Sequence, residues 1–181
     1  MIWIWRIPNE WSNKRIGTVL KNTGTDRFEF LKGKTLDENT TVCPNVVFDC
    51  DEEFLFDVLP NNGALLIVSR RVLDIMDNLS KYDYQVFEAN VFVGKNKVNG
   101  YYLLNILNLV EILDKAGSVF TTIKNSNAIL KFEKLVYKEE DLINHSIARN
   151  ADYLQHVVVS QELKEIFEKE NIKGVEFRIE P

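Results

Sequence analysis

The sequence contains little of the chemistry that defines a metal site, a disulfide framework or a nucleotide pocket. Its 181 residues include two cysteines, two histidines and eight glycines. Cys43 and Cys50 are too few for a disulfide framework, and their spacing without nearby histidines is not that of zinc ligands. His145 and His156 form no His-Glu-x-x-His motif, and no glycine-rich phosphate loop is present. We therefore expect two reduced, at least partly buried thiols, no metal and no cofactor.

Long apolar runs are also missing. No stretch approaches the roughly 20 apolar residues that span a bilayer. The opening MIWIWRIPNEW has neither the charged start nor the small-residue cleavage site of a signal peptide. With 45% apolar and 11% aromatic residues, the composition is that of an ordinary globular protein. These features predict a soluble, cytoplasmic protein with no membrane partner.

The charge is unevenly distributed along the chain. The net charge is −5, but residues 1–35 hold seven Lys and Arg against three acids, which leaves fifteen basic and twenty-four acidic residues in the remainder. Phosphate binding requires clustered Lys and Arg, so nucleic acid is not expected as the main ligand. An acidic body suits a basic partner, or serves solubility.

The first part of the chain, residues 1–60, is predicted to be rich in β-structure. The alternation in residues 2–7 is typical of a strand. Residues 18–33 resemble two strands around an Asn-Thr-Gly-Thr turn. A Pro-Asn-Asn-Gly turn at residues 60–63 is the predicted boundary with a C-terminal α+β part, residues 61–181, although both parts can share one compact domain.

Two strand-helix-strand units are expected in the C-terminal part. In each, an aliphatic run ends in a serine, a helical pattern follows, and a second apolar run closes the unit. Three apolar positions recur at the same offsets from Ser69 and Ser160, on one helical face; they are Val72, Ile75 and Met76, and Leu163, Ile166 and Phe167. The predicted fold class is therefore α+β with a mixed sheet.

Ser69 and Ser160 allow two interpretations. A serine between a strand and a helix is the position of the hydrolase nucleophile, but that strained turn requires small neighbours, as in Gly-x-Ser-x-Gly. The neighbours here are Val68 and Arg70, and Val159 and Gln161. We therefore interpret both serines as helix N-caps, whose hydroxyl accepts from free amides of the first turn.

Five carboxylates within nine residues are the strongest candidate for a binding surface: Asp49, Asp51, Glu52, Glu53 and Asp57. They can form a solvated loop, hold a cation, act as an acid and base pair, or present a negative patch to a basic protein. The spacing of a calcium loop is absent. Among functional interpretations the partner patch is favoured, because electrostatic complementarity requires only clustered like charge.

Two alternative functions remain open at this point. One is a small hydrolase that uses these carboxylates, or His145 paired with Asp141, as general acid and base. The other is a non-enzymatic adaptor whose tryptophan-rich edge binds a partner. Trp3 and Trp5 would share one face of a strand near Trp11, and their simplest role is packing in the core.

The order of several short motifs resembles a family of bacterial immunity proteins from polymorphic toxin systems, long catalogued as a domain of unknown function. The motifs cover residues 60 to 180 and are a Val-Ser helix start, a Val-Gln-Phe-like strand, a Tyr-Tyr-x-x-Asn strand, a serine after Leu-Asp, and a closing Val-Ser helix with Gly-Val-x-Phe. Here they are Val68 and Ser69; Gln85, Val86 and Phe87; Tyr101, Tyr102 and Asn105; Leu113, Asp114 and Ser118; and Val159, Ser160, Gly174, Val175 and Phe177.

The resemblance implies a non-enzymatic function, in which the protein binds a cognate toxin stoichiometrically and blocks it. It does not specify the toxin. An acidic body would steer toward a basic toxin, such as a nuclease. The resemblance implies no catalytic residues, cofactor or nucleic-acid partner, and it leaves the oligomeric state open.

Overall fold

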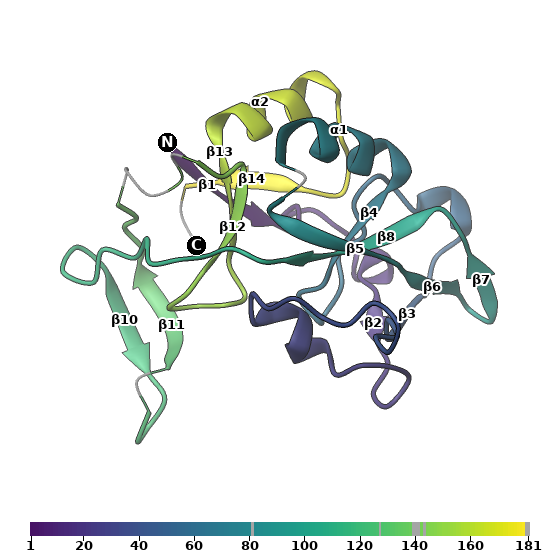
Figure 1. Cartoon of the computed structure of the whole chain (residues 1–181), viewed down its shortest axis with the longest axis horizontal. Coiled ribbons are helices and arrows are strands. Elements are labelled where there is room, and N and C mark those ends of the chain that lie inside the picture. Colours follow the sequence, from purple (N-terminus) through teal and green to yellow (C-terminus); the bar gives the residue numbers. More distant parts are fainter. Residues whose placement is uncertain (81, 127, 139–141, 143, 180–181) are drawn as a thin grey trace.

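The protein is an α+β structure with mixed sheets, as the sequence predicts (Figure 1). The structure is a computed structural model, and it describes residues 1–80, 82–126, 128–138, 142 and 144–179. The largest sheet has the order β14-β1-β13-β12-β9, with bounds Glu176–Arg178, Ile2–Arg6, Val157–Ser160, Ile147–Asn150 and Leu109–Val110. A three-stranded sheet has the order β4-β8-β5, with bounds Leu66–Ser69, Tyr101–Ile106 and Tyr84–Glu88.

Two further sheets are present in the described part of the chain. One has the order β2-β3-β6-β7, with bounds Thr18–Val19, Asn45–Phe48, Asn90–Val93 and Asn96–Val98, and the other is the hairpin of β10 (Val119–Thr122) and β11 (Ile129–Lys134). The α-helices are α1 (Arg70–Ser80) and α2 (Gln161–Lys169), and the 3-10 turns are η1 (Asn13–Arg15), η2 (Arg27–Leu31) and η3 (Glu52–Phe54). Pairings β3–β6 and β12–β9 are parallel, and the remaining pairs are antiparallel.

Both predicted strand-helix-strand units are present, and they share an arrangement that the sequence does not reveal. Strands β4 and β5 flank β8, and strands β13 and β14 flank β1. In each of these two sets of three, the central strand is antiparallel to both neighbours. The central strand follows its unit in one case and comes from the start of the chain in the other. The helix of each unit therefore connects two strands that lie on opposite sides of a third.

The two helices cover a common core (Figure 1). The residues with matching offsets from the two serines are buried in it: Val72 with Leu163, and Met76 with Phe167. Strand β1 adds its tryptophans to this core, while Ile2 and Ile4 face two other clusters. The period-two alternation of the first strand therefore places Trp3 and Trp5 on one face, half-buried against the helices.

The prediction of two strands in residues 18–33 is wrong for the second of them. Strand β2 is short, and the segment predicted as its partner forms the 3-10 turn η2 instead. Asp26 caps that turn by accepting a hydrogen bond from the backbone N–H of Phe28 at 2.9 Å. The actual partner of β2 is β3. Phe30 is completely buried in the second core, so its burial, rather than strand pairing, explains the apolar pattern.

The β10–β11 hairpin extends from the body of the molecule (Figure 1). Its base is anchored because Phe132 packs edge-to-face on Phe120 and Tyr153 in a third cluster with Ile4. Leu130 on the outer side is 61% exposed. A two-stranded ribbon is marginal on its own, so this aromatic base stabilises it.

Candidate functional site

The two serines lie at helix N-termini, with cap hydrogen bonds. Ser160 Oγ accepts from the backbone N–H of Leu163 at 3.2 Å, and Ser69 Oγ accepts from that of Val72 at 3.4 Å. Ser69 Oγ also donates to Asp57 Oδ1 at 3.4 Å. Within the described part of the chain, neither hydrogen-bond pattern includes a histidine, the base that most often activates a serine nucleophile.

Asp57 differs from the other four carboxylates because it connects three segments inside the fold. Its Oδ2 accepts from the backbone N–H of Lys173 at 3.2 Å and lies 3.6 Å from Arg71 Nη1. Its backbone carbonyl accepts from the N–H of Ser69 at 2.7 Å, and only 20% of its side chain is exposed. Arg71 also donates to the carbonyl of Glu170 after α2, so the network ties both helices to this segment.

The other carboxylates of the predicted patch face solvent. Asp49, Asp51, Glu52 and Glu53 are all exposed, on and beside η3, and within the described part of the chain none makes an ion pair. The negative charge of the segment also acts on a neighbouring phenol. The pKa of Tyr101 is raised to about 12, mainly by burial and further by the charges of Asp57 and Glu52. Four free negative charges on a short segment create a local field that favours a basic partner.

Half-exposed aromatic rings border this acidic segment. Trp11 packs edge-to-face on Phe56, with ring centroids 5.3 Å apart. The Arg15 guanidinium lies over Phe54 at 4.7 Å, and within 5.5 Å of the Phe56 and Trp11 centroids. We call Trp11, Arg15, Phe54 and Phe56 the ring cluster. Aromatic residues and arginine are the types that dominate the energetics of protein interfaces, so the cluster adds anchors to the charged segment.

The sequence contained only part of the signal for this cluster. Phe54 and Phe56 lie between Glu53 and Asp57 in the sequence, but nothing local predicts that residues 11–15 contact residues 54–56. Trp3 and Trp5 have another role. Trp3 Nε1 donates to Gln161 Oε1 at 2.6 Å, and Trp5 packs on Phe167 at 5.5 Å. They stabilise α2 on the sheet and form no exposed tryptophan-rich edge.

The two histidines lie apart from the acidic segment. His145 Nδ1 is 2.8 Å from Asp83 Oδ1, and Asp141, the partner considered from the sequence, lies outside the described residues. His156 is buried, with Nδ1 2.9 Å from the Tyr137 hydroxyl and Nε2 3.4 Å from Arg6 Nη1. Burial and the Arg6 charge lower its pKa to about 4. Among the described residues, no hydrogen bond or ion pair joins the carboxylates of segment 49–57 to either histidine, and the carboxylate beside His145 is Asp83.

Several motif residues from the sequence have structural contacts. Gln85 and Asn105 face each other across β5 and β8 and hold the segment after η2: Asn105 donates to Lys34 O at 2.8 Å, and Gln85 exchanges two hydrogen bonds with the Leu36 backbone. Ser118 Oγ exchanges hydrogen bonds with the backbone of Val136 in the same way. These motif residues therefore build the scaffold.

Across the described ranges, no three His, Cys, Asp or Glu side chains converge as metal ligands. Both cysteines have free thiols, and Cys43 is buried. The pKa of the Cys43 thiol is raised to about 12, mainly by desolvation and further by the negative charge of Glu88. Neither described helix has the length and apolar character needed to cross a membrane.

The fold contains two strand-helix-strand units and presents an acidic surface beside aromatic rings. These features are consistent with the family that the sequence motifs resemble. A family model of immunity proteins matches residues 11–179, nearly the whole chain. The chain therefore belongs to the immunity protein family Imm11. No curated protein matches it.

Proposed function

We propose that this immunity protein binds its cognate toxin stoichiometrically, in the cytoplasm and without catalysis, through the acidic segment 49–57 and the ring cluster. The observation that carries the proposal is the group of four exposed, unpaired carboxylates beside half-exposed aromatic rings. Charged groups at the rim accelerate encounter, and aromatic groups at the centre slow dissociation. The expected partner is a protein toxin with a basic binding face.

Family membership supports this role over the two alternatives considered from the sequence. The hydrolase considered from the sequence would require the acids of segment 49–57 to approach a histidine, whereas His156 contacts Tyr137 and Arg6, and His145 contacts Asp83. An adaptor with a tryptophan-rich edge would require Trp3 and Trp5 to be exposed, whereas both pack on α2 or its residues. Binding, rather than turnover, is the function that these contacts favour.

The first experiment is co-expression with the toxin encoded by the neighbouring gene. We expect relief of toxicity and a stable complex. Continued toxicity with no complex would remove the proposed pairing.

The second experiment locates the surface. The triple variant Asp51→Lys, Glu52→Lys, Glu53→Lys should slow association at low salt by about tenfold or more, because steering depends on local charge. A matched control makes the same change in net charge at scattered exposed acids, Glu38, Glu111 and Glu133. Equal slowing in both variants would show that only the net charge matters, and would reject segment 49–57 as the docking surface.

A further inference from the structure

A cleft with no acidic lining residue among those described lies between the end of β1, residues 58–66 and the residues that lead into β13. It has a volume of about 340 Å³, within the range of small-molecule sites. Its walls include apolar side chains from Trp5, Val58, Leu65, Leu66 and Val157. In a chain of net charge −5, no described residue that lines it is acidic.

The positive charge in this cleft belongs to Arg6. Its side chain lies 3.4 Å from His156 Nε2, and it makes no ion pair with a described residue. Glu176 lies opposite Arg6 in the β1–β14 register, but its carboxylate binds Arg178 through two hydrogen bonds of 2.8 Å and the Asn9 N–H at 3.1 Å. The nearest acid on the paired strand therefore has its own partners.

The contacts of His156 fix which groups the cleft can offer. Because Arg6 donates to Nε2, the ring proton lies on Nδ1 and is directed to the Tyr137 oxygen. Burial keeps this ring neutral at pH 7. Arg6 is thus a cation beside a neutral acceptor, and its remaining N–H groups, which bind no described residue, can bind an anion.

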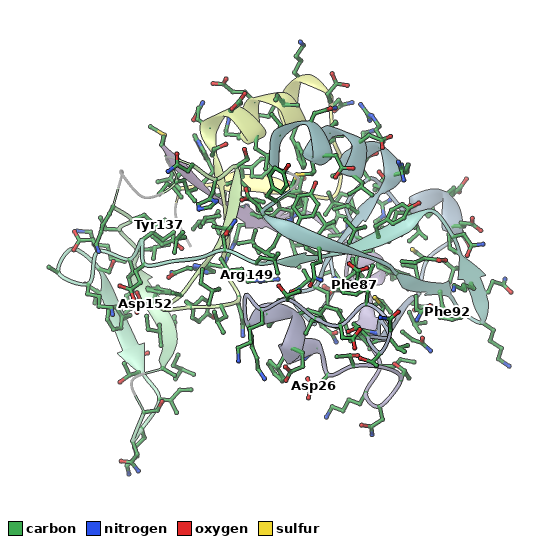
Figure 2. The ribbon with its side chains drawn as sticks, in the orientation of Figure 1. Asp26, Phe87, Phe92, Tyr137, Arg149 and Asp152 are labelled. Carbon is green, nitrogen blue, oxygen red and sulfur yellow. The ribbon has the colours of Figure 1, made fainter. Side chains whose placement is uncertain are left out.

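A second cation reinforces the positive potential behind the wall. Arg149 is completely buried in the interior (Figure 2). It donates to the carbonyl of Leu154 at 2.8 Å and to that of Ala64, a residue of the cleft, at 3.4 Å, and its Nε has no partner in the described structure. Burial lowers its pKa to about 10, so it stays protonated at neutral pH. A buried cation without a carboxylate is costly, and a nearby anion would offset part of that cost.

We propose that this cleft binds a carboxylate carried on an apolar body, with Arg6 as its ion partner. The planar guanidinium matches the two oxygens of a carboxylate, and the single lining cation balances one negative charge. A phosphate would require more cations or a nest of backbone N–H groups. The aromatic and aliphatic walls fit the body of the ligand. This proposal does not depend on the toxin-binding surface.

The test uses the wild-type protein, because its two histidines provide a reporter and an internal reference. Benzoate is titrated while the ring protons of His156 and His145 are followed by NMR. We expect saturable shifts at His156, none at His145, and a Kd on the order of 1 mM for so small a ligand. Benzamide, the neutral counterpart, and inorganic phosphate should leave His156 unchanged. No shift with benzoate, or equal shifts with either control compound, would overturn the proposal.

Variants and a second probe identify the partner groups and the source of the carboxylate. Arg6→Gln should weaken benzoate binding by about tenfold or more, since it removes the charge-assisted hydrogen bonds to the carboxylate. Arg70→Gln, an equal change of charge on the exposed face of α1, should leave it unchanged. Equal weakening by both would contradict the role of Arg6. A tripeptide ending in phenylalanine, compared with its amide, tests a peptide terminus as the source; binding of the acid alone supports it.

Discussion

Gly174 occupies the position where the chain tolerates a side chain least. It lies between α2 and β14 with a φ of 95°, in the left-handed region. A Cβ atom there would overlap the carbonyl oxygen of Val58. The two segments are also joined by the hydrogen bond from Val58 N–H to Lys173 O, at 2.9 Å. Gly174→Ala therefore introduces backbone strain and steric overlap together.

The two costs can be separated with a second glycine. Gly100 has a φ of 88°, but a Cβ there would meet nothing within 4 Å. The left-handed conformation alone costs about 1–2 kcal/mol for alanine, so Gly100→Ala should lose about that much. Gly174→Ala should lose a further roughly 1–3 kcal/mol, because relieving the overlap displaces well-packed backbone. We expect a total loss of about 2–5 kcal/mol.

The assay is urea unfolding followed by tryptophan fluorescence, since Trp5 packs on Phe167 in the shared core. The free energy of unfolding from the linear extrapolation is compared for wild type and both variants. In a thermal scan, each 1 kcal/mol should correspond to about 2–4 °C for a chain of this size. Equal losses in the two variants would refute the reasoning, because the contact with Val58 would then contribute nothing.

Two further predictions concern the acidic segment and the buried histidine. Asp57→Ala should lower the free energy of unfolding by about 1–3 kcal/mol, because Ser69, Lys173 and Arg71 lose their partner. Asp51→Ala should change the free energy of unfolding by less than about 0.5 kcal/mol. Similar losses for the two variants in a urea titration would contradict the assignment of Asp57 to the scaffold and Asp51 to the surface. For His156, the folded pKa of about 4 lies below the unfolded value of 6.5, so its contribution is complete above pH 6.5 and is lost as the pH falls toward 4. Between pH 6.5 and pH 4 the free energy of unfolding of the wild type should fall by about 3 kcal/mol relative to that of His156→Phe. Urea unfolding at several pH values measures this difference. A difference that stays constant with pH would show that His156 does not titrate in this way.

Where local pattern and local physics agree, the sequence was sufficient to predict structure. Alternation of Trp3 and Trp5 with isoleucines identified β1, because side chains of a strand alternate between its faces. The offsets of Leu163 and Phe167 from Ser160 predicted a helix with one buried face. Failure came at residues 27–31, where burial of Phe30 in a 3-10 turn produces an apolar pattern similar to that of a strand.

Long-range contacts decided the remainder. No local signal places β1 between β13 and β14, because pairing across more than 150 residues depends on the packing of all three strands with both helices. The same limit applies to function. Clustered acids are visible in the sequence, but only the tertiary structure separates Asp57, which joins three segments, from Asp51, which is free in solvent. Likewise, only the folded chain brings Arg6 and His156 together in a cleft that no described acid lines.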